Sequence, residues 1–434
     1  MKTGIRDFLS TFGGRVGAML LAIISQIILA RVLGPSGRGS LYVCQVFQSI
    51  LALVFAVGCD VAAVYFVSSR RFSLSEGVTY TLLNGTVSSI LAIIAGWLLI
   101  SSELEYFTKA TPAEFKLSLL FLPITLFSLV FHNLLTAVGR FGFFGIVTLL
   151  RAAVQVICTL IFVWWAGWGV SGGIWATIAA YGTGLLVSLC VLFFIDHTRL
   201  VRPEIKKAGK MFFYGLRYYF GKLSNIANMQ VGSIVLGFLA TESEIGYFSV
   251  AFRLLKQVES ISQTLATILF PRVAAARDGK RELIARVVRA TLAFCGGALF
   301  LIAVFARPLI VGLYDIDYAP AVPLLRILCL AIGLRCLGKL LAPYLIGTDH
   351  PGFASIAVGA GAIINVGLIF ILLPVIGISG AAWGVTGSYL ISTVILLVGF
   401  CYFSKLSLAE IFTYHREDFT DLTMMAHKII GKFK

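Results

Sequence analysis

The residues of this sequence best suited to chemistry are cations placed inside long apolar runs. Five of them are candidate ligands for an anionic substrate: Arg15, Arg151, Lys222, Arg253 and Lys256. An Arg or Lys at the centre of a bilayer costs about 2.5–3.5 kcal/mol to insert, so such side chains usually face a protein interior or water. The acids in these runs are few, Asp60 and Glu259. The excess of cations over acids predicts a water-filled cleft that holds anions.

Helical spacing gathers several of these side chains on common faces. Arg253, Lys256 and Glu259 are separated by steps of three, which places them on one face of a helix. The same spacing recurs in the preceding apolar run, in Lys222, Asn225 and Asn228. We expect the two polar stripes to face a common cavity, with the two asparagines as part of its polar lining.

Each of the two acids has two explanations. Asp60 is either a site for a coupling ion or the salt-bridge partner of Arg15 or Arg151. Glu259 is a candidate for the same coupling role, or it neutralises Lys256 one turn away. The sequence leaves both alternatives open.

Four further cations have different expected roles. Arg335 and Lys339 lie in one apolar run, where they either line the cavity or hold helices together. Arg31 and Arg38 flank the turn at 34–37, and we predict that they are structural parts of that turn.

Membrane-spanning helices must position all these charges. Of the 434 residues, 59% are hydrophobic and only 13% are charged, against about 25% charged in a soluble protein. Runs of about 20 apolar residues are long enough to cross ~30 Å of hydrocarbon. We predict an all-α polytopic membrane protein with about twelve such spans, at 11–33, 40–67, 77–101, 116–138, 142–166, 169–195, 211–239, 244–271, 290–313, 320–346, 352–376 and 379–403.

Basic residues are concentrated in alternate connections between these runs. One side includes Lys2 and the loops at 196–210 and 272–289, whereas the other carries acids such as Glu103 and Glu242. Because Lys and Arg are retained in cytoplasmic loops, both termini are predicted to be cytoplasmic. This topology accounts for much of the net charge of +15, so we expect no nucleic acid as a partner.

The two halves of the chain repeat one another. Residues 219–246 form a weaker copy of 12–39, and the offset of 207 residues puts Lys222 at the position of Arg15. We predict that these two cations lie at similar depth and form a phosphate clamp. The repeat extends to other pairs at offsets of 207 or 208, namely Gly39 with Gly246, the motif 169–175 (GVSGGIW) with 377–383 (GISGAAW), and Tyr181 with Tyr389.

The repeat predicts the domain organisation. Six spans per copy give both copies the same orientation, so two six-helix lobes should be related by a pseudo-two-fold axis along the membrane normal, as in many transporters. The predicted parts are an N-terminal lobe at 1–195, a basic cytoplasmic loop at 196–210, a C-terminal lobe at 211–403 and a cytoplasmic amphipathic tail at 404–434.

The sequence lacks the patterns of an enzyme or a metalloprotein. It has no phosphate-cradling P-loop and no His/Cys/Asp cluster with metal-ligand spacing. The eight cysteines lie in apolar runs without a CxxC pair, which is typical of small buried hydrophobic residues. We therefore expect a protein that is not an enzyme, with no catalytic residues, no cofactor and no metal.

The end of the first run resembles the polysaccharide and O-antigen flippases. The residues that carry the resemblance are Leu29-Ala-Arg-Val-Leu-Gly-Pro35, followed by Gly37 and Gly39. These flippases of lipid-linked oligosaccharides belong to the multidrug/oligosaccharidyl-lipid/polysaccharide exporter superfamily, with the lipid II flippases and the multidrug-and-toxin extrusion antiporters. The resemblance covers the whole chain and implies a cationic cavity lined by the first, second, seventh and eighth spans. It places these residues at the cavity: Arg15, Asp60, Lys222, Arg253 and Lys256.

The resemblance implies a transport function. We expect a flippase that moves an undecaprenyl-pyrophosphate-linked oligosaccharide across a bacterial inner membrane by alternating access. The partners implied are this lipid-linked oligosaccharide, membrane lipids, H+ or Na+ as a coupling ion, and other polysaccharide-assembly membrane proteins. Two alternatives stay open. A cation-coupled multidrug-type exporter should have a cavity dominated by carboxylates, and a membrane glycan polymerase or ligase should have a larger external loop.

Overall fold

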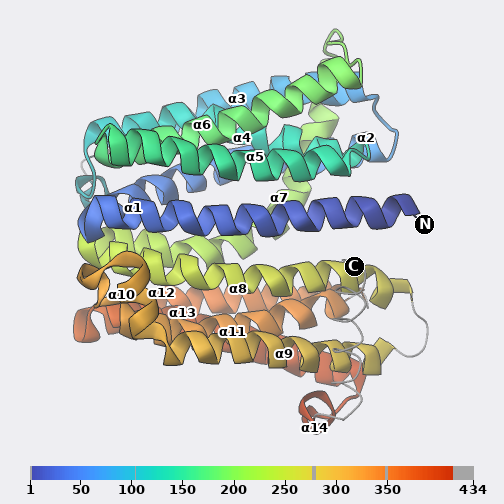
Figure 1. Cartoon of the computed structure of the whole chain (residues 1–434). Helices are drawn as coiled ribbons and strands as arrows, with labels where there is room; N and C mark the ends of the chain where they lie inside the picture. The colour runs from blue at the N-terminus through green and yellow to red at the C-terminus, as the bar shows by residue number, and fades with distance from the viewer. Residues whose placement is uncertain (1, 103, 276–279, 348–349, 414–434) are drawn as a thin grey trace. The chain divides into compact units, whose positions relative to one another are not determined.

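The protein is built from α-helices throughout the part of the chain that the computed structural model describes (Figure 1). The backbone is described for residues 2–102, 104–275, 280–347 and 350–413. The side chains are described over the same ranges except for most of 2–16, 217–231 and 261–291 and a few single positions. The predicted all-α polytopic fold is confirmed.

The helices fall into two compact units. The first unit comprises residues 1–226 and 236–249, and the second comprises 227–235 and 250–434. The first seven helices are α1 (Lys2–Ala56), α2 (Cys59–Ser68), α3 (Leu74–Ile100), α4 (Pro112–Ala137), α5 (Phe141–Thr159), α6 (Gly169–Cys190) and α7 (Ile205–Leu239). The remaining helices are α8 (Glu242–Ala275), α9 (Lys280–Val304), α10 (Ala306–Tyr314), α11 (Ala321–Gly347), α12 (Pro351–Ile376), α13 (Ile378–Ser404) and α14 (Leu408–Phe412).

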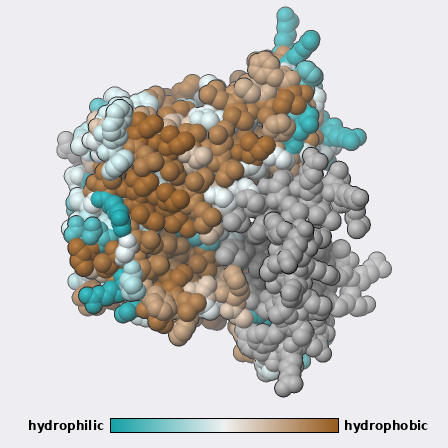
Figure 2. All heavy atoms as spheres, viewed as in Figure 1, coloured by the Kyte–Doolittle hydropathy of each residue, from teal (hydrophilic) through white to brown (hydrophobic). Residues whose placement is uncertain are grey.

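Most of these helices are suited to a membrane. Among the described residues, eight helices are long and apolar enough to cross one, and a ninth candidate is the pair α9 and α10. Apolar side chains cover most of the described surface in Figure 2, and hydrophilic side chains gather toward the helix ends. The lipid-facing character is clear on α3, where Ile90, Ile94, Trp97 and Leu98 are all exposed. The chain is a multi-pass membrane protein.

Two predicted spans are interrupted. The predicted run at 40–67 breaks at Val57 and Gly58, which have φ of 43° and 67°, and α2 begins after them. The break lies where α7 crosses, because a Cβ on Gly58 would lie 2.4 Å from the carbonyl oxygen of Gly215. The predicted run at 290–313 bends by 72° between α9 and α10. Pro308 explains this bend, since its ring cannot continue a helix past the carbonyl four residues earlier.

Several helices begin with the same side-chain motif. A Ser or Thr hydroxyl accepts the backbone N–H of a Glu three residues on, and that Glu accepts the backbone N–H of the Ser or Thr. The pairs are Ser73 with Glu76 before α3, Thr111 with Glu114 before α4, Thr241 with Glu244 before α8, and Ser407 with Glu410 before α14. Each pair satisfies two backbone groups that a helix end would otherwise leave without partners.

The GxSGxxW repeat has the same backbone geometry in each unit. Gly169 begins α6 and Gly377 directly precedes α13, and their φ values of 58° and 62° are in the left-handed region that favours glycine. Three residues later, a Cβ on Gly172 or Gly380 would lie 2.9 or 2.6 Å from a backbone oxygen of the preceding helical segment. The repeated glycines therefore permit one tight helix–turn–helix crossing, used twice.

Ion pairs connect helices at the predicted cytoplasmic end of the first unit. Arg140, at the start of α5, donates to Asp196 at 2.5 Å, just after α6 and its terminal turn. Lys207 on α7 donates to both Glu204 and Glu76 at 2.8 Å. These two carboxylates raise the pKa of Lys207 above its ordinary value. The contacts fix the start of α7 against α3.

Candidate anion-binding site

The second unit contains a buried cluster of charges between α8 and α11. Glu259 on α8 is 3% exposed. Its Oε1 atom accepts a hydrogen bond from Arg335 Nε at 2.6 Å and a second from Lys339 Nζ. One carboxylate oxygen thus holds two cations that lie one turn apart on α11. Removing one partner of such a buried pair typically costs about 3–5 kcal/mol, because a charge is left uncompensated.

Tyr389 on α13 supports the same cluster from a third helix. The guanidinium of Arg335 lies over the Tyr389 ring, 4.7 Å from its centroid. A cation over an aromatic face gains roughly 0.5–2 kcal/mol, depending on how far water is excluded. The ring also fixes the plane of the guanidinium, so that Arg335 is held by a carboxylate on one side and an aromatic face on another.

The side chains of the cluster differ in exposure, and Glu259 is less exposed than either cation that it binds. The side chain of Glu259 is 4% exposed, that of Arg335 is 12% and that of Lys339 is 23%. Lys256, on the same face of α8 as Glu259, is exposed, and the charges of Arg335 and Lys339 act on it. The anion is therefore the most buried of these charges, and the cations are more exposed.

Arg253, on the same face of α8, adds a fourth cation to the cluster. It precedes Lys256 by three residues, as the sequence predicted, and it is partly buried. Four cations therefore accompany one carboxylate, and the group has an excess of positive charge. Such a group is suited to an anion and unsuited to an organic cation.

The first unit holds a separate polar pocket around Arg151. The guanidinium of Arg151 on α5 lies over the ring of Tyr181 on α6, 3.8 Å from its centroid. Gly184 makes room for it, because a Cβ there would lie 2.4 Å from Arg151 Cδ. The pocket beside this pair has a volume of about 390 Å³. Its lining includes Gln155 and His132.

His132 is held in this pocket by two neighbours. Its ring stacks on Phe144, with centroids 4.0 Å apart, and Nε2 lies 3.3 Å from the Thr148 hydroxyl. The histidine therefore has a packing role beside the arginine.

The tyrosines of both sites occupy equivalent repeat positions. Tyr181 and Tyr389 are 208 residues apart, and each carries a guanidinium on its ring. The arginine comes from α5 in the first unit and from α11 in the second. The sequence signal was the tyrosine pair itself. Its arginine partners could not be predicted, because the two arginines are not related by the repeat.

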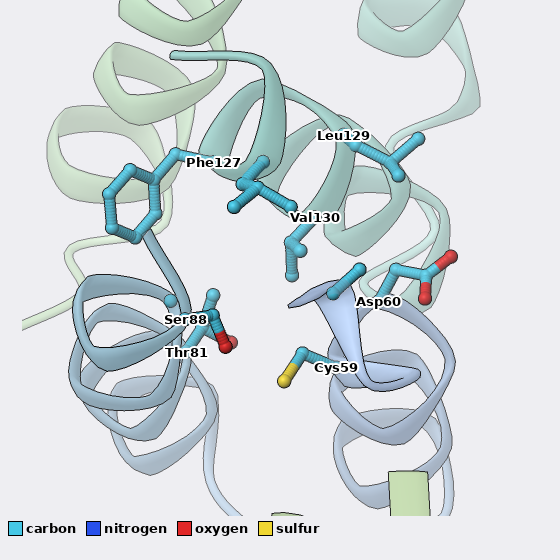
Figure 3. Close-up of a pocket in the computed structure, with 10 residues that line it drawn as sticks. Cys59, Asp60, Thr81, Ser88, Phe127, Leu129 and Val130 are labelled. Atoms are coloured by element: carbon cyan, nitrogen blue, oxygen red, sulfur yellow. The ribbon is translucent and has the colours of Figure 1, made fainter. Parts of the chain in front are cut away.

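Asp60 lines a small, mostly apolar pocket in the first unit. It is 6% exposed in the first turn of α2, where a helix N-terminus favours a negative charge. The pocket is lined by Cys59, Thr81 and Ser88 among others, and its volume of about 10 Å³ accommodates no more than a water molecule. Figure 3 shows the Asp60 carboxylate directed away from the Thr81 and Ser88 hydroxyls.

Arg38 is the largest fully buried side chain among the described residues. It follows the kink of α1 at Gly34, where φ is 65°, and donates to the Gln26 side chain on the other limb of the helix. The bond joins the two limbs of α1 across the kink. This contact supports the structural role predicted for Arg38.

Gly39 and Gly246 occupy equivalent positions of the repeat, and each contacts the backbone of the other copy. All the residues of this contact belong to the first unit. A Cβ on Gly39 would lie 1.8 Å from the carbonyl oxygen of Glu242, and a Cβ on Gly246 would lie 2.0 Å from that of Pro35. Pro35 and Glu242 are themselves 207 residues apart. The kink of α1 and the start of α8 therefore cross with reciprocal backbone contacts that require glycine at both positions.

Part of the predicted site lies outside the described side chains. The helical backbone is described at Arg15 on α1 and at Lys222, Asn225 and Asn228 on α7, but their side chains are not. Their predicted roles stay predictions. The described cations of the predicted set are Arg151, Arg253 and Lys256, which divide between the two units.

Comparison with known protein families establishes the class of this protein. The model of the family described as "Polysaccharide biosynthesis protein" matches residues 5–277. The match covers more than half of the chain, so the protein belongs to this family.

A curated relative agrees with this assignment. It is the probable low-salt glycan biosynthesis flippase Agl15 of Haloferax volcanii, 24% identical over 241 residues. The alignment covers 53% of this chain and 51% of the relative, so the chain spans about half the length of the curated relative it matches.

Two solved structures share the fold over nearly the whole chain. The lipid II flippase MurJ in an inward closed conformation has a TM-score of 0.74 at 16% identity, covering 98% of this chain and 96% of the other. A MATE family multidrug resistance transporter of the MOP superfamily, inward-facing, has a TM-score of 0.72 at 19% identity, covering 90% and 96%. At such identities the likeness establishes the fold alone.

Proposed function

We propose that this protein is a flippase that moves an undecaprenyl-pyrophosphate-linked oligosaccharide across the bacterial inner membrane, with both termini in the cytoplasm. A pyrophosphate and a hydrophilic glycan cannot cross hydrocarbon unaided, whereas the lipid tail can stay in the bilayer. The observation that carries the proposal is the excess of cations between α8 and α11, where four cations accompany Glu259. Membership of the polysaccharide biosynthesis family supports the class of cargo.

The proposed mechanism is alternating access without a chemical step. Arg253 and Lys256 receive the phosphates in the second unit, and Arg151 acts in the first. Arg15 and Lys222 form the predicted phosphate clamp, because the repeat aligns them at the same position of two helices. The glycan is bound weakly and released, so the protein acts as a transporter and not as an enzyme.

The driving force is proposed to be a coupled ion. H+ or Na+ are the candidates, and Asp60 is the candidate carboxylate, since it is buried in the N-terminal turn of a helix. The named relatives also support lipid-linked cargo: one is called a glycan biosynthesis flippase and another a lipid II flippase.

A cellular assay tests this proposal. Arg151, Lys222 and Lys256 are replaced singly by Ala, expression in the membrane is verified, and surface polysaccharide is measured. We expect each variant to lose surface polysaccharide and to accumulate its lipid-linked precursor. Lys116→Ala is the matched control, because Lys116 is a cation on α4 that lies over the Trp97 ring and is assigned no role in binding. Normal surface polysaccharide in all three variants would contradict the proposal, and drug resistance without a glycan phenotype would favour the multidrug-type exporter.

A further inference from the structure

The cluster of Glu259, Arg335 and Lys339 bears on a requirement of any anion carrier, which is that its cationic site must be stable without the anion. A site with several cations in a low-dielectric environment is stable while a phosphate occupies it, but it must also exist empty. Two adjacent cations with no anion repel each other and lack compensation, which is costly in apolar surroundings. A carrier that returns without cargo therefore needs an anion of its own.

We infer that Glu259 is this internal anion and that Arg335 and Lys339 form an oxyanion site, which the cargo phosphate takes over from Glu259. This inference rests on the proposed function and adds the residues that hold the phosphate in the second unit. Both cations donate to the single oxygen Oε1 of Glu259. Neither cation was assigned to substrate binding by its sequence position alone.

The geometry leaves donors for an incoming anion. Arg335 donates from Nε to Glu259 while its guanidinium lies over the Tyr389 ring, and its two terminal nitrogens carry further N–H groups. Lys339 has three N–H donors, and in the described part of the chain it donates to Glu259. A tetrahedral phosphate can first accept hydrogen bonds from these N–H groups. It can then replace the carboxylate of Glu259 as their acceptor. Nothing covalent is formed or broken in this exchange.

The order of exposure gives a direction to the exchange. Lys256 is exposed, Lys339 is 23% exposed, Arg335 is 12% and Glu259 is 4%. A phosphate that approaches from the accessible side meets cations before it meets the carboxylate. Glu259 then stays behind the cations, where it neutralises them again when the phosphate leaves.

The role of internal anion predicts a gain of affinity when its charge is removed. A purely structural salt bridge predicts the opposite, because its loss would distort the site and weaken binding. Glu259→Gln keeps the size and the acceptor oxygen of the side chain and removes only the competing charge. We expect it to bind inorganic pyrophosphate about tenfold more tightly than the unmodified protein does, and to unfold at a lower temperature when no anion is present.

The experiment uses the full chain, purified into nanodiscs of phosphatidylcholine, a lipid with no net charge. Calorimetric titration with inorganic pyrophosphate compares the unmodified protein with Glu259→Gln, Glu259→Asp, Lys339→Gln and Arg335→Gln, after size-exclusion chromatography has shown that each is folded. Glu259→Asp keeps the charge and should bind like the unmodified protein. Lys339→Gln and Arg335→Gln should bind at least tenfold more weakly, and Lys116→Ala should show no change. Orthophosphate provides a second arm, in which weaker binding than pyrophosphate is expected.

The outcomes separate this inference from the proposed function. Weaker or unchanged pyrophosphate binding by Glu259→Gln overturns the inference even if the cellular assay shows glycan transport. Tighter binding by Glu259→Gln and weaker binding by Lys339→Gln sustain the oxyanion site even if the cargo in cells is a different phosphorylated lipid. If Arg335→Gln does not fold, Lys339→Gln decides alone, since Lys339 is the more exposed of the two.

Discussion

The reciprocal contact between Gly39 and Gly246 gives a prediction with a calculable size. In Gly39→Ala the new methyl group would lie 1.8 Å from a backbone oxygen, and in Gly246→Ala it would lie 2.0 Å from one, whereas an ordinary contact needs at least 3.4 Å. Backbone cannot rotate away as a side chain does. The kink of α1 and the start of α8 must therefore part by about 1.4 Å or more in either variant, which is the difference between these distances.

The free energy needed to separate the two segments determines how much the population of the separated state should rise. Forcing extra atoms into a packed contact typically costs about 1–3 kcal/mol. A cost of that size raises the population of the parted state by a factor of roughly 5–150. The double variant should cost less than the sum of the two single variants, because once the segments have parted, the second methyl group no longer meets a carbonyl.

Hydrogen–deuterium exchange measures this population directly, since exchange reports local opening. We expect peptides covering 35–43 and 242–249 to exchange roughly 5–150 times faster in Gly39→Ala and in Gly246→Ala. Gly182→Ala is the matched control on α6, because a Cβ there meets nothing within 4 Å. Unchanged exchange in both variants, with the control also unchanged, would refute the assigned contact.

Two further perturbations probe the scaffold of the site. Gly169→Ala and Gly377→Ala each place a side chain on a residue with left-handed backbone and should each destabilise the protein by about 1–2 kcal/mol. Gly142→Ala is the control and should have little effect, because a Cβ at Gly142 meets nothing within 4 Å. Equal thermal stability of all three variants would contradict the repeated-turn geometry. Gln26→Leu removes a hydrogen-bond acceptor from the buried Arg38 and should lower the stability of the protein to thermal unfolding by about 1–3 kcal/mol. It should also accelerate hydrogen exchange around the kink of α1. A variant as stable as the unmodified protein would show that this bond does not hold the two limbs of α1 together.

The sequence predicted the features that depend on local pattern. Apolar runs predicted the helices, and the repeat paired the two GxSGxxW motifs, whose first glycines, Gly169 and Gly377, both have a left-handed backbone. The stepping of Arg253, Lys256 and Glu259 correctly placed them on one continuous helix, α8. These properties follow from residues close together in the chain, so spacing alone is sufficient.

The features that the sequence missed depend on which helices are neighbours. Glu259 has Lys256 one turn away, but its hydrogen bonds go to Arg335 and Lys339, more than 70 residues later. A composition pattern cannot reveal that α8 and α11 meet at this point. The break at Val57 and Gly58 was missed for the same reason, because it exists to let Gly215 of α7 pass closely.

The central claim is that this protein moves a pyrophosphate-linked glycan lipid through a cationic path. Its most direct test is translocation of a fluorescent undecaprenyl-pyrophosphate oligosaccharide in vesicles that contain only the purified protein. Externally added glycosidase digests the lipid-linked glycan that has reached the outer leaflet. The account predicts that digestion proceeds beyond the outer-leaflet fraction with the unmodified protein and with Lys116→Ala, and stops at that fraction with Lys256→Ala and in empty vesicles. Digestion beyond that fraction at the same rate with Lys256→Ala, or digestion by the unmodified protein no greater than in empty vesicles, would contradict it.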